Sequence, residues 1–174
     1  MDYEVIIVRL IAAVLVGGLI GYEREHENSP AGFRTNILVC VGAAVVSLIS
    51  ESNLQRAMEL ANNPMYQNMI KVDIGRLGAQ VISGIGFLGA GTILVEKGTI
   101  KGLTTAATLW LVACLGLAIG QGLYAISVTG AVIVVITLSL FKKADNFINE
   151  RKNKTKKKQV EDNSNLTYFE DNNM

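Results

Sequence analysis

Charge is scarce in this 174-residue chain and is absent from one long stretch. Asp, Glu, Lys and Arg make up 18% of the residues, against about 25% in an ordinary soluble domain. None of them occurs between Gly102 and Phe141, while hydrophobic residues make up 50% of the whole chain. A chain this short cannot bury so much apolar surface in one soluble core. The composition therefore excludes a soluble enzyme, a secreted disulfide scaffold and a disordered chain.

Cysteine and histidine are also rare, which removes several kinds of site. Cys40 and Cys114 both lie in apolar runs, and two such cysteines do not make a disulfide framework. His26 is the single histidine, so the chain has no Ser/His/Asp set and no cysteine–histidine metal site. It also has no P-loop lysine, and we expect no enzyme. No basic stretch precedes the first apolar segment, which is therefore expected to remain as a membrane anchor.

Five apolar segments have lengths suited to a bilayer core. They predict an all-α fold, a polytopic transmembrane helix bundle over residues 1–141 with about five spans. The predicted spans are residues 3–22, 35–50, 77–95, 103–119 and 123–141. Residues 51–76 are predicted as a polar loop with a surface helix at 54–60. Residues 142–174 are predicted as a disordered cytoplasmic tail, first basic and then acidic.

The distribution of lysine and arginine predicts the orientation of the bundle. With five spans and a cytoplasmic tail, the cytoplasmic side holds Arg24, Arg34, Lys97, Lys101 and eight tail residues. The outer side holds Arg56, Lys71 and Arg76. This imbalance predicts that the N-terminus is outside and the C-terminus is cytoplasmic. In a four-span alternative, the third segment enters and leaves on one side.

The third segment is unusually rich in glycine, with six between Gly75 and Gly91. Small residues let membrane helices approach closely, whereas glycines can also mark a break or a re-entrant bend. The third span is thus either a packing helix or a broken one. The stretch 84–89 matches GxGxxG but lacks the strand and the later acid of a dinucleotide site. Helix packing is predicted for Gly17, Gly21, Gly84, Gly86, Gly89 and Gly91, and the pairs Gly17/Gly21 and Gly116/Gly120 could support oligomerisation.

Ionisable residues at membrane depth are costly and usually face protein. Arg9 shares a helical face with small residues of the first span, which directs it towards the bundle. Asp73, Arg76 and Gln80 share a face at the outer end of the third span. They could line a polar cleft in which Asp73 meets a cation, or Asp73 could pair with Arg76 or Arg9.

Two further groups are weaker candidates. Glu23, His26 and Glu27 have helical spacing that could face a metal ion, although a solvated charged turn is the commoner outcome. Asp73 and Glu23 are accordingly the weak metal candidates. Thr104 and Thr108 lie one turn apart at the start of the fourth span, where their hydroxyls can bond between helices or to their own backbone.

Several of these stretches resemble the motifs of the MgtC/SapB family. The first two are Gly21-Tyr22-Glu23-Arg24-Glu25 and Pro30-Ala31-Gly32-Phe33-Arg34-Thr35. The glycine-rich signature runs over residues 73–91, and a fourth stretch, residues 101–110, completes it. The resemblance covers residues 5–140, and the motifs are specific as a set. Longer, virulence-associated members carry a cytoplasmic domain after the last span, so this chain resembles the short branch.

The resemblance implies a multi-pass protein of the bacterial cytoplasmic membrane, associated with low magnesium, acid stress and survival inside host cells. By motif match it implies that Asp73, Arg76, Gln80 and the Glu23–Arg34 stretch are functional positions. Together with the residues singled out above, the predicted functional polar core is Arg9, Glu23, Arg34, Asp73, Arg76, Gln80, Thr104 and Thr108. The first hypothesis is a non-enzymatic factor in magnesium or acid-stress homeostasis that acts on a membrane partner, such as a membrane ATPase or the ATP synthase. The alternative is a small oligomeric channel or transporter for magnesium or another cation. A purely structural assembly protein is a third reading. A homo-oligomer is expected, nucleic acid is not, and magnesium is the one candidate ligand.

Overall fold

The computed structural model describes residues 2–62, 73, 75–96 and 98–140. It contains α1 (Tyr3–His26), α2 (Phe33–Ala61), α3 (Arg76–Gly91) and α4 (Leu103–Gly120). A short antiparallel hairpin of β1 (Leu94–Glu96) and β2 (Thr99–Lys101) separates α3 from α4. A further helix, Tyr124–Leu140, follows α4. The prediction of an all-α helix bundle is confirmed, and the hairpin is an addition that the sequence did not reveal.

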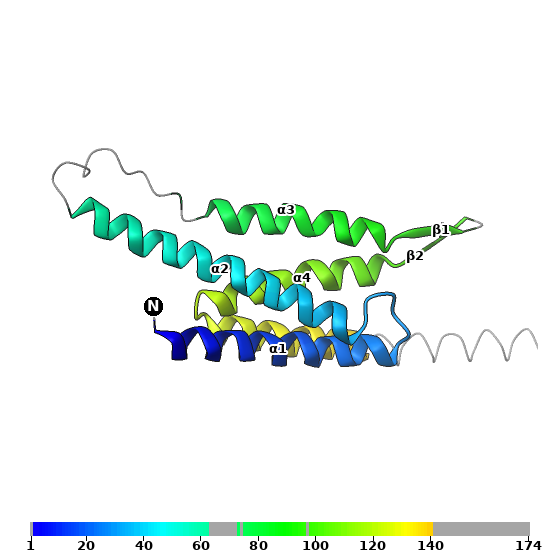
Figure 1. Ribbon diagram of the computed structural model, residues 1–174. Coiled ribbons are helices and arrows are strands. Elements are labelled where there is room, and N and C mark those ends of the chain that lie inside the picture. The colour runs from blue at the N-terminus through cyan, green and yellow to red at the C-terminus, as the bar shows by residue number, and fades with distance from the viewer. Residues whose placement is uncertain (1, 63–72, 74, 97, 141–174) are drawn as a thin grey trace, which may run out of the picture. The chain divides into compact units, whose positions relative to one another are not determined.

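The helices run back and forth beside one another (Figure 1). Helices α2 and α4 contact each other and both α1 and α3. In Figure 1, α1 and α3 lie on opposite sides of the α2/α4 pair. The chain forms two units, residues 1–135 and 136–174, and the four labelled helices all belong to the first. The predicted tail at 142–174 and its boundary lie outside the described residues.

Close packing of α1, α2 and α4 depends on glycine. A Cβ atom on Gly17 would lie 2.8 Å from the Cβ of Cys40, and one on Gly21 would lie 2.8 Å from the Cα of Phe33. On the other side of α2, a Cβ on Gly120 would lie 2.6 Å from the carbonyl oxygen of Ala44. Helix backbones approach this closely only where small residues meet. Glycines therefore fix α2 between α1 and α4.

Helix α3 is continuous from Arg76 to Gly91, so the predicted alternative of a glycine break is wrong. Its inner edge joins a small core made of Ala43, Ile85, Ala113 and Leu117. Gly89 packs at the ordinary distance of 3.4 Å from the Cβ of Ala106. Space is open beside Gly84, Gly86 and Gly91. Glycine does not interrupt this helix, since neighbouring helices supply the contacts that fix its inner edge.

The first helix continues past residue 22 to His26. Two further helix ends also differ from the prediction. The second helix continues past residue 50 to Ala61, and it absorbs the separate surface helix expected at 54–60. The third ends at Gly91 instead of residue 95, because the chain enters the hairpin at Leu94. Both differences have a local cause. Residues 51–61 are polar but good helix formers, whereas 94–101 can pair as strands.

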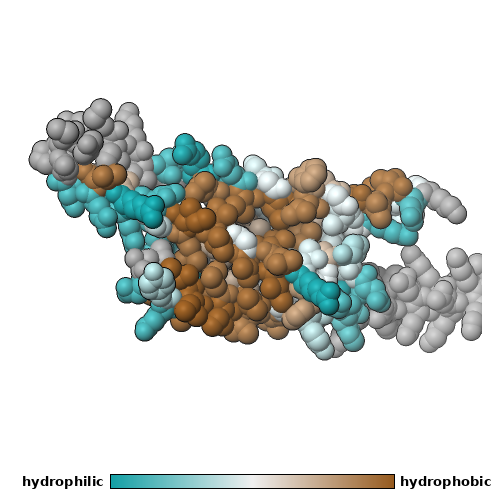
Figure 2. All heavy atoms as spheres, in the orientation of Figure 1, coloured by the Kyte–Doolittle hydropathy of each residue, from teal (hydrophilic) through white to brown (hydrophobic). Residues whose placement is uncertain are grey.

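Apolar side chains cover the middle of the face shown in Figure 2, and hydrophilic ones gather towards the helix ends. Ile7, Ile11, Leu15 and Leu19 of α1 are more than half exposed. Among the described residues, α1, α2 and α4 are long and apolar enough to cross a membrane. Exposed apolar surface of this kind suits lipid and not water. The chain is a membrane protein.

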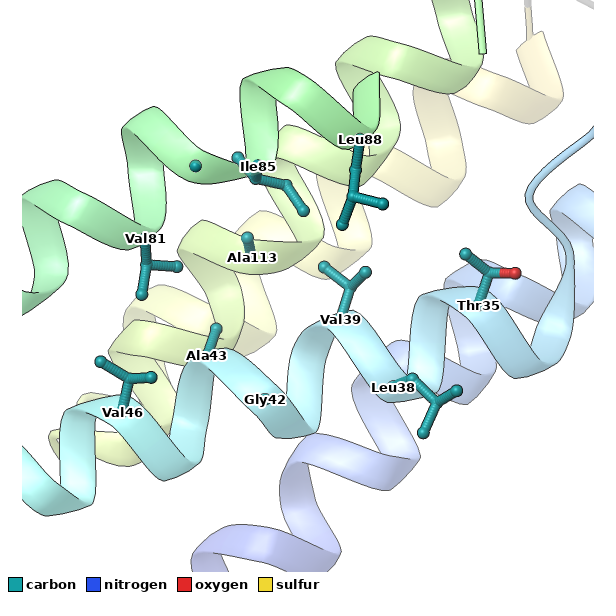
Figure 3. Close-up of a pocket in the computed structure, with 11 residues that line it drawn as sticks. Thr35, Leu38, Val39, Gly42, Ala43, Val46, Val81, Ile85, Leu88 and Ala113 are labelled. Carbon is teal, nitrogen blue, oxygen red and sulfur yellow. The ribbon is translucent and has the colours of Figure 1, made fainter. Parts of the chain in front are cut away.

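An apolar groove of about 580 Å³ lies between α2 and α3. Val39 and Val46 of α2 lie opposite Val81 and Leu88 of α3 (Figure 3), and Leu38 also lines the groove. Its floor holds Ala43 and Ala113. Gly42 and Gly84 line it without any atom near the place of a Cβ. The contact between α2 and α3 is thus much looser than the contacts that glycine makes in the rest of the bundle.

Candidate functional site

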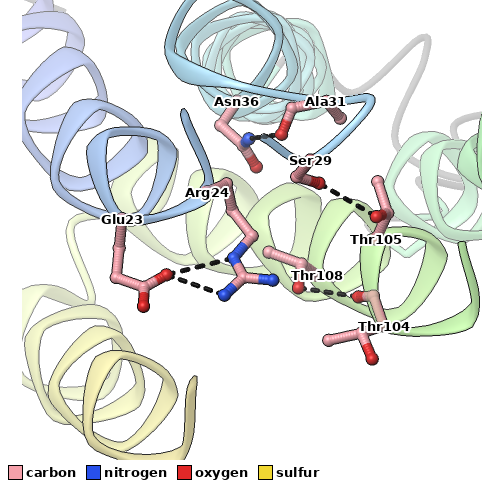
Figure 4. A network of polar contacts seen from close by, with 8 residues as sticks. All are labelled: Glu23, Arg24, Ser29, Ala31, Asn36, Thr104, Thr105 and Thr108. Carbon is pink, nitrogen blue, oxygen red and sulfur yellow. Dashed lines mark hydrogen bonds and ion pairs between the residues drawn. The ribbon is translucent and has the colours of Figure 1, made fainter. Parts of the chain in front are cut away.

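A polar cluster, which we call the loop-end cluster, lies where the α1–α2 loop meets the start of α4. It consists of Glu23, Arg24, Ser29, Asn36, Thr105 and Thr108. Arg24 is 8% exposed, and its Nε and Nη2 donate to one carboxylate oxygen of Glu23 at 3.2 and 2.7 Å. The partner is its sequence neighbour, so this ion pair does not itself join two helices. Figure 4 shows the Arg24 guanidinium reaching into the space between α1, α2 and α4.

The loop-end cluster also holds the loop in place. The backbone N–H of Ser29 donates to the carbonyl of Arg24 at 3.1 Å. The side chains of Ser29 and Thr105 share a hydrogen bond of 2.9 Å, which ties the loop to α4. Thr108 donates to the carbonyl of Thr104 at 2.8 Å, within its own helix. The loop conformation therefore depends on hydroxyls from α4 as well as on its own turn.

Asn36 completes the cluster from α2. Its side chain is fully buried, and Nδ2 donates to the carbonyls of Ala31 and Gly32 at 3.0 and 2.8 Å. Its Oδ1 is buried and has no hydrogen-bond partner among the described residues. Nearby, a Glu25 carboxylate oxygen accepts the backbone N–H of Phe33 at 2.8 Å, which caps the first turn of α2. Buried polar groups of this kind are normally satisfied, so Oδ1 retains an acceptor site for a donor inside the cluster.

A second polar cluster, the Arg9 cluster, lies at the opposite end of the helices and consists of Arg9, Ser47, Glu51, Gly120 and Gln121. Arg9 Nη1 donates to the Glu51 carboxylate and, at 2.7 Å, to the carbonyl of Gly120. One arginine thus joins α1 to both α2 and α4. A cavity of about 220 Å³ lies beside it, lined in part by Ser47 and Gln121. The Ser47 hydroxyl is buried and finds no partner in the part of the chain that the structure describes.

The structure does not bring Asp73, Arg76 and Gln80 to Arg9. The partner of Arg9 is Glu51, which lies in the stretch predicted from the sequence as a loop. Arg76 and Gln80 are exposed on the side of α3 away from the bundle. Asp73 is also exposed, and its Oδ1 accepts the N–H of Gly75 at 3.1 Å. These three polar residues form an outward surface instead of an internal cleft.

The remaining candidates divide between the loop-end cluster and its surroundings. Glu23 and Thr108 belong to the cluster, and Thr104 contributes its carbonyl. Arg34 is exposed and lines a separate polar pocket of about 630 Å³ with Glu25 and other loop residues. Across the described part of the chain, no group of three or more His, Cys, Asp or Glu side chains could hold a metal ion. A magnesium site at Glu23 or Asp73 stays a prediction.

Sequence reasoning did not single out Asn36, Ser29 or Thr105. Asn36 could have been found, since it is an amide at the start of an otherwise apolar stretch, where a polar side chain needs an internal partner. Ser29 gave no signal, because one serine in a polar turn is ordinary. The prediction that six glycines pack against other helices is confirmed for only some of them. Gly17, Gly21 and Gly89 meet neighbouring helices, whereas Gly84, Gly86 and Gly91 meet none within the described chain.

Comparison with known proteins gives a consistent result. The sequence profile of the MgtC family matches residues 10–147. "Putative magnesium transporter YhiD" of Escherichia coli is 38% identical over 135 residues, covering 78% of this chain and 60% of that protein. "Protein MgtC" of Salmonella typhimurium is 40% identical over 144 residues, covering 83% of this chain and 55% of that protein. An uncharacterised protein of Haemophilus influenzae is 34% identical over 158 residues, covering 90% and 64%. No solved structure matches.

The region matched by the family profile contains the loop-end cluster, all of α3 and the members of the Arg9 cluster other than Arg9 itself. The chain spans about 55 to 64% of the length of these relatives. The shared part is therefore the membrane bundle, and what the relatives do as whole proteins does not transfer with it.

Proposed function

The chain belongs to the MgtC family, and on that premise we propose that it is a non-enzymatic membrane factor in magnesium or acid-stress homeostasis. It acts by contact with a membrane partner and does not itself carry an ion. The magnesium link is supported by the relative that is named as a magnesium transporter. A membrane ATPase or the ATP synthase is the partner class that the family resemblance suggests.

The observation that carries this proposal is the apolar middle of the bundle. Between the two polar clusters, the facing residues of α1, α2 and α4 are small or apolar and buried: Ala13, Gly17, Cys40, Ala44, Val112 and Gly116. Ser127 is buried on the following helix, but its hydroxyl donates to the carbonyl of Leu115 at 3.3 Å. An ion that crosses a membrane needs polar ligands or water at this depth. The close helix contacts at Gly17, Gly116 and Gly120 therefore support a role other than ion passage through the middle of this bundle.

We further propose that the protein lies in the bacterial cytoplasmic membrane with its N-terminus outside. Arg24, Arg34 and Lys101 lie at the ends of helices that Figure 1 places at one end of the bundle. This is the end that the excess of basic residues assigns to the cytoplasm. The loop-end cluster and the exposed Arg34 in the separate polar pocket would then face the cytoplasmic side, where a partner can be reached.

Growth of a host that lacks the gene, in medium with limiting magnesium, tests the proposed role. The full chain should restore growth, and Asn36→Leu should restore it poorly because it removes the buried amide from the loop-end cluster. The control is Leu38→Ala, an exposed position two residues away on the same helix. If the full chain gives no growth advantage at low magnesium or low pH, the proposed role is wrong.

One observation favours the second candidate, a channel or transporter. Arg76, Gln80 and Ser83 form a polar strip on the outward side of α3, and several copies arranged around that strip could enclose a polar path. Transport of magnesium into sealed vesicles separates the two candidates. A flux that disappears in Gln80→Leu would favour transport along α3. No flux, together with growth at low magnesium, favours the partner mechanism.

A further inference from the structure

Helix α3 contacts the rest of the bundle along a single edge. The residues that face inward are four apart, namely Leu77, Val81, Ile85 and Gly89. Arg76, Gln80, Ser83 and Phe87 follow the opposite side with helical spacing and are all exposed, Phe87 by 84%. This side, which we call the outer face of α3, therefore has no covering within the described chain.

Lipid is a poor covering for the outer face. Gln80 lies one turn inside the helix and has an amide whose donors and acceptors lipid tails cannot satisfy. Arginine at such a position usually faces protein or pairs with another group. Neither Asp73 nor Arg76 forms an ion pair with any residue that the structure describes. The polar residues of the outer face thus require a partner of opposite or matching polarity.

The glycines of α3 point to the same surface. Elsewhere in the bundle, Gly17, Gly21 and Gly116 are used where another backbone comes close. Gly86 and Gly91 have nothing within 4 Å of the place of a Cβ and, unlike Gly84, do not line the groove towards α2, although glycine weakens a helix. Close approach of another helix is what makes such glycines favourable in membranes. The positions three and four residues away from Phe87 that do not line the groove are Ser83, Ala90 and Gly91, so the large ring stands above a floor of small residues.

We propose that the outer face of α3 is a homodimer interface in which the α3 helices of two copies lie parallel across a two-fold axis. Both copies have the same orientation in the membrane, so equivalent ends of α3 meet. The symmetry brings Asp73 and Arg76 of both copies to the same end of the interface, where each Asp73 can pair with Arg76 of the other copy across the axis. The two Gln80 amides can bond to one another, since each has donors and an acceptor. Each Phe87 ring packs over the small-residue floor of the other copy.

Charge self-complementarity is the reason to choose a second copy over an unrelated helix. An acid and a base lie three residues apart at one end of α3, and no third charge lies on its outer face. In a two-fold dimer, the acid of each copy can pair with the base of the other, so the chain is its own charge complement. A different protein would need its own acid and base at matching positions. This interface does not depend on the proposed role in magnesium homeostasis.

Disulfide cross-linking in native membranes tests the interface. Ser83→Cys lies on the outer face and should give a cross-linked dimer on mild oxidation. Leu15→Cys is the matched control, because it is 67% exposed on α1 and away from the interface. Wild-type protein gives the baseline for Cys40 and Cys114. Equal cross-linking of Ser83→Cys and Leu15→Cys would show random collision and would overturn the proposal.

Reversal of the charges makes the test specific. In the Ser83→Cys background, Asp73→Arg gives a copy with two bases at this end, and Arg76→Asp gives a copy with two acids. Each should lower its own dimer at least about tenfold through like-charge contact. When two differently tagged copies are expressed together, the mixed dimer should form at close to the unsubstituted level, which also shows that both variants fold. Unchanged homodimers, absence of the mixed dimer, or cross-linking of Ser83→Cys only to a different protein would each contradict the proposal.

Discussion

At the scale of single residues, glycine has two different environments in this chain. Gly116 lies against the backbone of Cys40 and the Cβ of Ala43, which a Cβ on Gly116 would approach to 2.9 Å. Gly42, on the facing helix, has open space where its Cβ would be. The same substitution therefore has opposite effects at two glycines that both lie in membrane helices.

We predict that Gly116→Ala destabilises the bundle by about 1–3 kcal/mol, because it forces α4 away from α2. Gly42→Ala should leave the free energy of unfolding unchanged or raise it by up to about 1 kcal/mol, because alanine favours a helix. Unfolding in mixed detergent measures both. Equal shifts of the two unfolding midpoints would show that the α2/α4 contact is not set by Gly116.

The Glu23–Arg24 pair is the main charged element of the loop-end cluster. Removing one charge from a buried pair leaves the other uncompensated. We predict that the losses of unfolding free energy in Glu23→Gln and in Arg24→Gln add up to more than the loss in the double variant. The difference, the coupling energy, should be about 1–3 kcal/mol. A double-mutant cycle on the unfolding free energy measures it. Additive effects would mean that the two side chains do not depend on each other.

At the scale of helices, the Arg9 cluster connects three elements through one side chain. We predict that Arg9→Met lowers the free energy of unfolding by about 2–4 kcal/mol, because it leaves Glu51 unpaired and frees the end of α4. Arg56→Ala is the control. It lies on the same helix as Glu51, is exposed, and should change stability by less than about 0.5 kcal/mol. If Arg9→Met and Arg56→Ala change the free energy of unfolding by the same small amount, Arg9 does not stabilise the bundle by joining α1 to α2 and α4.

The sequence is sufficient to predict that the apolar segments are helices, because a long apolar run in a membrane has few other ways to satisfy its backbone hydrogen bonds. It fails where polar residues continue a helix. Glu51 follows the apolar run of α2 and so resembles a loop residue, which hides the true partner of Arg9. Once Glu51 is assigned to a loop, Asp73 and Arg76 are the remaining charged residues that the sequence offers as neighbours of Arg9. Arg76 in fact lies on the outer face of α3, and Asp73 lies just before that helix. Which face is outward depends on which edge of α3 packs, and the inward residues decide this only once α2 and α4 are in place.

The loop-end cluster shows the same limit. Three of the four stretches that carry the family resemblance meet there, through Arg24, through the Ala31 carbonyl that accepts from Asn36, and through Thr105. Each stretch alone resembles an ordinary polar turn or helix start. Their convergence is a tertiary property. It requires α2 to lie between α1 and α4, which follows from glycine contacts distributed over three helices.

At the scale of the whole molecule, the orientation can be measured directly. We predict that Asn62→Cys, at the end of α2, reacts with a membrane-impermeant maleimide added to intact cells whose outer barrier has been opened. Thr99→Cys, in the hairpin, should react only after the cytoplasmic membrane is permeabilised. Cys40 is buried in the unsubstituted chain, which keeps its own labelling low. The reverse pattern of labelling would invert the topology.

The central claim is that the bundle is closed to ions and works through a partner. Its most direct test is magnesium flux into sealed liposomes that contain the purified full chain and an internal magnesium-sensitive dye, with an ionophore as the positive control. Because small and apolar residues fill the space between the loop-end and Arg9 clusters, we predict no flux above empty liposomes under any gradient of magnesium, protons or voltage. A protein-dependent flux that Gln80→Leu abolishes and Gly42→Ala leaves intact would contradict the claim.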